Sequence, residues 1–169
     1  MIMLSVMFLS ACGGSGVYVN RGTGKVWYVD DSGGVQTNDL VRLQQATPFT
    51  IVIPSYLPVE VSSAPVMFIK TIGIRSEDDV DVRFSYWNSP KGVTIKETDY
   101  PSDLIPNPGY SYIQINNINV LQMPSKNFVG SVTVDVYSYA WDKGGVSFTV
   151  DVWDYSEAES RKTVGSMIK

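Results

Sequence analysis

The feature that most constrains the fold is an alternation of apolar and polar side chains that recurs along most of the chain. Its clearest stretch runs from Val80 to Tyr86, where every second residue is valine, phenylalanine or tyrosine and the residues between are charged or hydroxylated. Successive side chains of a β-strand point to opposite faces, so this period of two predicts a strand with one buried face. The same pattern returns between Val132 and Val136 and between Phe148 and Val152. The sequence therefore predicts a sheet built from half-buried strands.

Short turns between these stretches predict that neighbouring strands run antiparallel. Asn116 and Asn117 separate two apolar stretches, and adjacent asparagines tolerate the positive φ angles of a two-residue type I′ turn. The run Trp141–Gly145 ends in two glycines and precedes the stretch at Phe148, which predicts another turn. Such short turns favour an antiparallel meander, because a parallel pair needs a long crossover.

Only the C-terminal segment has a clear helical signal. Ser156 and Glu159 have the spacing of a capping box, in which each side chain satisfies a free backbone N–H of the other residue. Val164, Met167 and Ile168 then share one helical face. Strands followed by one helix predict an α+β fold, mainly an antiparallel meander sheet of roughly six or more strands with the C-terminal helix packed on it.

Four further segments have weaker patterns. Asn38–Gln45 has the apolar side of a short helix, with Asn38 as its expected N-cap. Thr50–Ile53 is expected to be a short strand, and Val66–Arg75, which is apolar on both faces, a central strand. Tyr100–Gly109 contains three prolines and is expected to be a surface loop.

The first residues have the features of an export leader. Met1–Ala11 form an apolar run, which is shorter than the roughly 20 residues that a helix needs to span a bilayer. The run ends in Leu9, Ser10, Ala11 and Cys12, which resembles the lipobox of bacterial lipoproteins. In that family the lipobox cysteine receives a diacylglyceryl group and becomes the new N-terminus. The resemblance implies that Cys12 carries a lipid.

This resemblance divides the chain into three parts. Residues 1–11 are expected to be a signal peptide, residues 12–16 the lipidated Cys12 with a glycine-rich tether, and residues 17–169 a single mostly-β domain. The implied location is the extracytoplasmic side of the cell membrane, with the lipid as anchor. The alternative interpretation is a buried core cysteine that follows an N-terminal strand.

The composition narrows the chemistry that the chain can perform. It contains no histidine and one cysteine, which excludes Ser-His-Asp and Cys-His triads, His-bearing zinc sites and an internal disulfide. The formal net charge of -4 provides no electrostatic footprint for nucleic acid. We therefore expect no catalytic residue, no metal site, no cofactor and no nucleic-acid partner.

Two motifs suggest a site but have simpler interpretations. Glu77, Asp78, Asp79 and Asp81 form the densest acidic cluster, which suits calcium, but their spacing matches no EF-hand loop. Asp79 and Asp81 are expected instead on the water-facing side of a strand. The run Gly22–Lys25 resembles a phosphate-binding loop but lacks its first glycine and its final hydroxyl residue, so a hairpin turn explains it.

Aromatic residues near the turns are the candidate binding residues. Trp87, Trp141 and Trp153 lie at predicted strand ends, and Tyr86 precedes the first of them. Tryptophan and tyrosine suit binding surfaces because they combine a broad apolar area with a polar tip. One helix covers only about 20 Å of a wider sheet, so part of the sheet must face solvent, a loop or a partner. The alternative is that these aromatics pack at the edge of the sheet.

Several stretches from Leu40 onward occur in an order that is typical of one bacterial domain. They are Pro48–Pro58, Phe84–Tyr86, Gly92–Glu97, Trp141–Gly145 and Ser166–Ile168. Together they resemble an envelope domain of unknown function, found as the outer C-terminal domain of some anti-sigma factors and in lipoproteins linked to sporulation or stress. The resemblance implies a sensing or binding module and supplies no catalytic residues.

The expected function is therefore that of a membrane-anchored extracytoplasmic lipoprotein acting as a non-catalytic binding or sensing module of the cell envelope. Its expected partners are the membrane, through the lipid anchor, and an unidentified envelope protein or small ligand. Two alternatives stay open. One is an enzyme that acts on wall glycans through carboxylates alone, and the other is a purely structural envelope protein.

Overall fold

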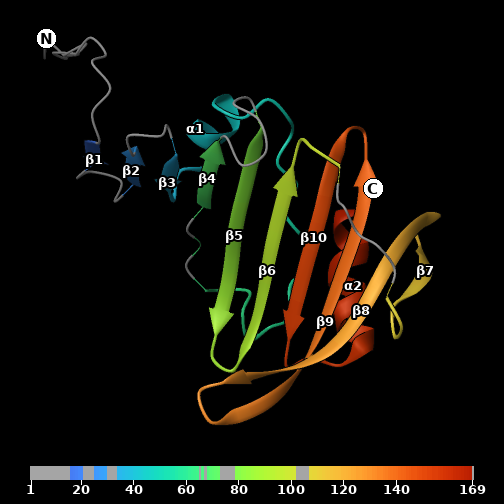
Figure 1. Cartoon of the computed structure of the whole chain (residues 1–169). Coiled ribbons are helices and arrows are strands. Elements are labelled where there is room, and N and C mark those ends of the chain that lie inside the picture. Colours follow the sequence, from blue (N-terminus) through green and yellow to red (C-terminus); the bar gives the residue numbers. More distant parts are fainter. Residues whose placement is uncertain are drawn as a thin grey trace, which may run out of the picture.

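The computed structural model describes residues 16–20, 25–29, 34–64, 66, 68–72, 79–101 and 107–168. Within these residues, ten antiparallel strands form one sheet that is accompanied by two helices, which confirms the predicted α+β class (Figure 1). The elements are β1 (Gly16–Asn20), β2 (Lys25–Val29), β3 (Val35–Thr37), α1 (Leu40–Gln45), β4 (Phe68–Ile72), β5 (Val80–Asn88), β6 (Lys91–Thr98), β7 (Ser111–Ile115), β8 (Ile118–Val129), β9 (Val132–Lys143), β10 (Val146–Trp153) and α2 (Glu157–Met167).

The sheet consists of two meanders joined side by side. Strands β1 to β6 follow each other in sequence order, and β7 to β10 follow in the reverse spatial order, so β10 pairs with β6 in the middle of the sheet. The register of the central strands places Phe84, Ile95, Val150 and Tyr139 side by side. All four side chains are buried, so they mark the face that carries the core.

That face, called here the helix face, is covered by α2 (Figure 1). Ser156 is the N-cap of α2, and its hydroxyl accepts a hydrogen bond from the Glu159 N–H, which confirms the predicted start of the helix. Val164 and Met167 of α2 join the same buried cluster as Phe84 and Val150. The opposite side, called here the outer face, carries the alternate residues of the same strands.

The segment between α1 and β4 also lies against the helix face. Ile51 and Val61 are buried in the same core cluster as the strands. The hydroxyl of Ser55 donates to the carbonyl of Ser166, and the hydroxyl of Ser166 donates to the carbonyl of Tyr56, so this segment runs beside α2. A single helix is too narrow to cover the sheet, and this extended segment covers part of the remaining width.

Three of the sequence predictions are corrected here. Thr50–Ile53 is extended but is not a strand, because its backbone bonds to side chains and not to a neighbouring strand. The short helix begins at Leu40, and Asp39 is its N-cap in place of Asn38. The strand predicted over Val66–Arg75 is described as β4, which pairs with β3 and β5 as a central strand does, but its exposed Ile69 shows that one of its two apolar faces points to solvent.

The predicted turns agree with the structure. Asn116 and Asn117 have φ angles of 48 and 64, as a type I′ turn requires, and Gly144 and Gly145 also have positive φ between β9 and β10. The amide of Asn116 donates to the carbonyls of Gly165 and Ile168, so the β7–β8 turn also binds the end of α2. In the described part of the chain, no helix is long and apolar enough to cross a membrane.

Candidate functional site

The structure divides the predicted aromatic surface between the two faces of the sheet. Trp87 and Trp153 lie on the outer face, where their rings meet edge to face with centroids 5.6 Å apart. Tyr86 and Trp141 lie on the helix face and are 6% and 4% exposed. The four residues therefore do not form one surface, and each pair has a different environment.

The outer-face pair is packed around Gly92. This glycine lies between Trp87 and Trp153 in the strand register, and a Cβ added to it would lie 2.0 Å from Cε3 of Trp87. Because Gly92 has no Cβ, there is room for the Trp87 ring at this position. Trp87 keeps 39% of its surface exposed, and the buried Nε1 of Trp153 has no hydrogen-bond partner among the described residues.

Trp141 lies in a different setting, at the floor of a cleft on the helix face. Its ring is stacked on Phe148 of β10, with centroids 5.0 Å apart and planes inclined by 7°. The cleft, called here the Trp141 cleft, has a volume of about 540 Å³. Its lining is mostly apolar and consists of Pro48, Phe49, Thr50, Val52, Trp141, Lys143, Gly144, Val146, Phe148 and Met167. The segment Pro48–Val52 and the β9–β10 hairpin therefore build the cleft, together with the last residue of α2.

One wall of the Trp141 cleft is held in place by side chains that bond to its backbone. The amide of Gln44, on α1, donates to the Phe49 carbonyl and accepts from the Ile51 N–H, both at 2.8 Å. The Val52 N–H lies 3.0 and 3.1 Å from the two carboxyl oxygens of Glu97. Pro48–Val52 is thus fixed by α1 at one end and by β6 at the other, although it belongs to neither element.

Glu97 itself is a buried carboxyl beneath this wall. It pairs in register with Phe148, and its side chain is fully buried. Removal from water disfavours the ionised form and raises its pKa from 4.5 to about 8, while the bond from Val52 acts in the opposite direction. Glu97 therefore carries a proton at neutral pH and adds no negative charge beneath the Pro48–Val52 wall of the cleft. The alternation along β6 could have indicated that Glu97 is buried, because Glu97 lies on the same face of the strand as Val93 and Ile95.

The acidic cluster differs from its prediction. Asp81 does not face water but is fully buried on the outer face, where Arg83 Nε and Lys96 Nζ lie 2.9 and 3.1 Å from its oxygens. The carboxylate of Asp81 raises the pKa of Arg83. The alternation along this strand predicts that Asp81 is exposed, but its carboxylate is buried because two cations compensate its charge. Asp79 is half-buried, and the other two acidic residues of the cluster lie outside the described residues.

The remaining predicted sites lie partly or wholly outside the described residues. This holds for Cys12, the apolar run before it, and the glycines of Gly22–Lys25. Among the residues that are described, no group of three or more histidine, cysteine, aspartate or glutamate side chains is placed to hold a metal ion.

Comparisons of the chain with known proteins identify no relative. Searches against protein-family models, curated proteins and solved structures each returned no match. The resemblance to the bacterial envelope domain thus stays a prediction from the sequence, and the functional argument depends on the geometry of the sites.

Proposed function

We propose that this chain is a lipoprotein anchored through Cys12 on the extracytoplasmic side of the cell membrane, and that it acts there as a non-catalytic binding or sensing module. The observation that carries the binding role is the Trp141 cleft. Its volume of about 540 Å³ is in the usual range for small-molecule sites, which are mostly apolar with a few polar groups. The anchoring role is supported by Leu9–Cys12 at the end of the apolar run.

The lining of this cleft favours a ligand with an apolar or aromatic group. The stacked rings of Trp141 and Phe148, which are 4% and 5% exposed, form the apolar floor of the cleft, and Phe49 and Met167 add to the walls. Lys143 and the glycine beside it contribute the polar rim. The protonated Glu97 behind Val52 adds no charge, so burying an apolar group here leaves no carboxylate to desolvate.

The positions of the two buried carboxyl groups with a raised pKa argue for binding over carboxylate-dependent hydrolysis of glycans. Burial raises the pKa of both Glu97 and Asp151, as a general acid requires. Glu97 lies on the helix face, in register with Phe148, whereas Asp151 lies on the outer face, bonded to Ser138. A glycosidase needs two carboxyl groups that flank one glycosidic bond, and these two are separated by the sheet.

Binding of the apolar dye N-phenyl-1-naphthylamine tests the cleft. We expect saturable binding to the protein, weakened about tenfold in Phe49→Ala because one wall of the cleft is lost. Phe128→Ala is the matched control, since Phe128 lies on the β8–β9 hairpin and is 72% exposed. Equal dye affinity in Phe49→Ala and the wild type would contradict the site, and no saturable binding at all would favour a purely structural role.

Membrane fractionation tests the anchor separately. The wild-type protein from a native membrane fraction should carry a diacylglyceryl group on an N-terminal Cys12, detectable by mass spectrometry. Cys12→Ser should leave that fraction, because stable anchoring needs lipid chains that the serine variant cannot receive. A free Cys12 thiol with an intact Met1 in the membrane fraction would refute lipidation.

A further inference from the structure

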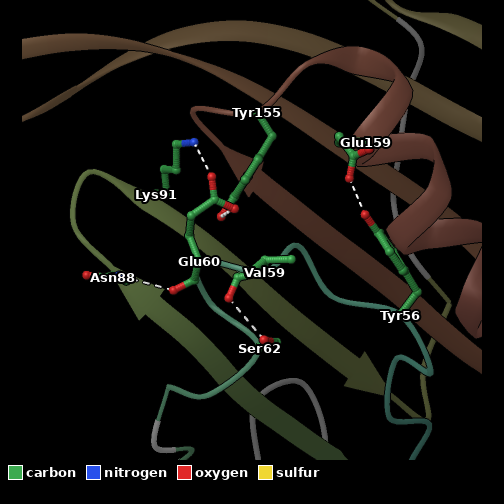
Figure 2. A network of polar contacts seen from close by, with 8 residues as sticks. All are labelled: Tyr56, Val59, Glu60, Ser62, Asn88, Lys91, Tyr155 and Glu159. Carbon is green, nitrogen blue, oxygen red and sulfur yellow. Dashed lines mark hydrogen bonds and ion pairs between the residues drawn. The ribbon is translucent and has the colours of Figure 1, made fainter.

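A second hollow lies at the opposite end of α2 from the Trp141 cleft. It has a volume of about 420 Å³ and opens between the segment around Tyr56–Glu60, the first turn of α2 and the β5–β6 turn (Figure 2). It is called here the tyrosine cleft, and its lining consists of Tyr56, Pro58, Val59, Glu60, Lys91, Asp154, Tyr155, Ser156 and Glu159. No sequence pattern indicated this site, because its residues come from three separate segments.

Two tyrosines form the walls of this cleft and are held by carboxylates. The hydroxyl of Tyr56 donates to Glu159 on α2, and the hydroxyl of Tyr155 lies 3.5 Å from Oε2 of Glu60 (Figure 2). Tyr155 is buried, and its pKa is raised to about 12, so its phenol stays neutral. Both rings thus have fixed positions, and the face of a tyrosine ring attracts cations.

The charged groups of the cleft are predominantly acidic. Among the lining residues, three carboxylates, those of Glu60, Asp154 and Glu159, accompany one ammonium group, that of Lys91, and Lys162 contacts the Tyr56 ring without belonging to the lining. The hydrogen bond from Lys91 lowers the pKa of Glu60, which therefore stays ionised at neutral pH. An excess of carboxylates between aromatic walls suits an organic cation, because the carboxylates accept its N–H groups and the rings contact its alkyl part.

Two lysines of the chain already lie against the tyrosine rings of this cleft. Lys91 Nζ lies 2.7 Å from Oε1 of Glu60 and 4.9 Å from the centroid of the Tyr155 ring. Lys162 Nζ lies 3.8 Å from the centroid of the Tyr56 ring. The chain thus shows, with its own side chains, that both rings and Glu60 accept an ammonium group at contact distance.

We propose that the tyrosine cleft binds the end of an alkylammonium ligand, which enters between Tyr56 and Tyr155 and is held by Glu60 and Glu159. Lys91 competes with this ligand for Glu60 and for the Tyr155 ring. The exposed side chain of Val59 at the rim contacts the alkyl part of the ligand. A lysine side chain of a partner peptide and a free diamine share this chemistry. The inference is independent of the Trp141 cleft and of the lipid anchor.

Titrations followed by NMR or calorimetry test the proposal with three probes. The amine 1,5-diaminopentane and the peptide-like N-acetyl-lysine methylamide should both bind, whereas the uncharged 1-pentanol should not. The stronger of the two amines identifies the source, a free diamine or a peptide. If neither amine saturates, or if 1-pentanol binds as well as they do, the proposal is wrong.

Three variants test the roles of the charged groups, and their expected effects on amine affinity have opposite signs. Glu60→Gln and Glu159→Gln should each weaken amine binding about fivefold, because each removes one charged acceptor. Lys91→Met should strengthen amine binding about fivefold, because it removes the competing ammonium group and keeps the apolar stem. A merely structural role for Lys91 would weaken binding in Lys91→Met, which would overturn the proposal.

The matched control is Glu157→Gln, which makes the same change of charge two residues before Glu159, on a different side of α2. Glu157 pairs with Arg161 and accepts from Gln122, and it does not line the tyrosine cleft. Its amine affinity should equal that of the wild type. An equal loss of affinity in Glu157→Gln and Glu159→Gln would show that only the overall charge matters, which contradicts a defined site.

Discussion

Replacing Glu97 with glutamine should remove a pH dependence that this buried carboxyl imposes on folding. In the folded protein the pKa of Glu97 is raised to about 8, against an ordinary value of 4.5. The folded state therefore holds a proton that the unfolded state releases between these two values. A raised folded-state pKa contributes its full stability below pH 4.5, and this stability is lost as the pH rises towards 8.

The magnitude follows from the difference between the two pKa values. Each pH unit between them removes up to about 1.4 kcal/mol from the free energy of unfolding. The wild-type protein should thus lose about 3 kcal/mol between pH 5 and pH 8 through this group alone. Glutamine keeps an oxygen that accepts the Val52 N–H and does not ionise. As the pH rises from 5 to 8, the free energy of unfolding of Glu97→Gln should therefore increase relative to that of the wild type by the same amount.

Urea denaturation at several pH values between 5 and 8 measures this difference. The chain has no histidine, so no side chain with an ordinary pKa titrates near the middle of this range. Glu157→Gln is the control, because the pKa of Glu157 is lowered and its titration is complete below the range. Parallel profiles for the wild type and Glu97→Gln would refute the assignment of a protonated, desolvated carboxyl beneath the Trp141 cleft.

Three further perturbations test the packing. Gly92→Ala should lower the free energy of unfolding by about 1–3 kcal/mol, because its methyl group would lie 2.0 Å from the Trp87 ring; an unchanged urea midpoint would show that the ring has room to move. Asn116→Gly keeps the turn backbone but removes two hydrogen bonds to the end of α2, so urea denaturation should show a loss of about 1–2 kcal/mol, and equal stability would contradict that role. Acrylamide should quench a variant that retains only Trp87, which is 39% exposed, more strongly than one that retains only Trp141, which is 4% exposed; equal quenching would contradict the placement of the two rings.

The secondary structure was largely predictable because its signals are local. Alternation between Val80 and Tyr86 corresponds to one buried and one outer face of β5, and Asn116–Asn117 adopts the expected turn. Ser156 is the N-cap of α2, as its spacing to Glu159 predicted, while the Glu159 carboxylate accepts from Tyr56 instead of completing the capping box. Each of these features depends on residues within a few positions of one another, so the sequence contains all the information that they need.

The candidate sites were predictable only in part. Trp141 was proposed as a binding residue, and it does line a cleft, but the stacked Phe148 and the wall at Phe49 were not part of that prediction. The tyrosine cleft had no sequence signal, since Tyr56 and Glu159 are far apart in the chain. The burial of Asp81 was also missed, because the pattern of its strand does not reveal that two cations cover it.

The sequence by itself determined most of the central strands, where several turns occur, where the C-terminal helix begins, and which chemistries the absence of histidine excludes. Only the tertiary structure decided that β10 lies between β6 and β9, that Thr47–Ala64 covers the helix face beside α2, and that Glu97 is protonated beneath it. The physical reason is the range of the interactions. Alternation and capping act over a few residues, whereas strand order, burial and pKa values depend on which distant segments exclude water from one another.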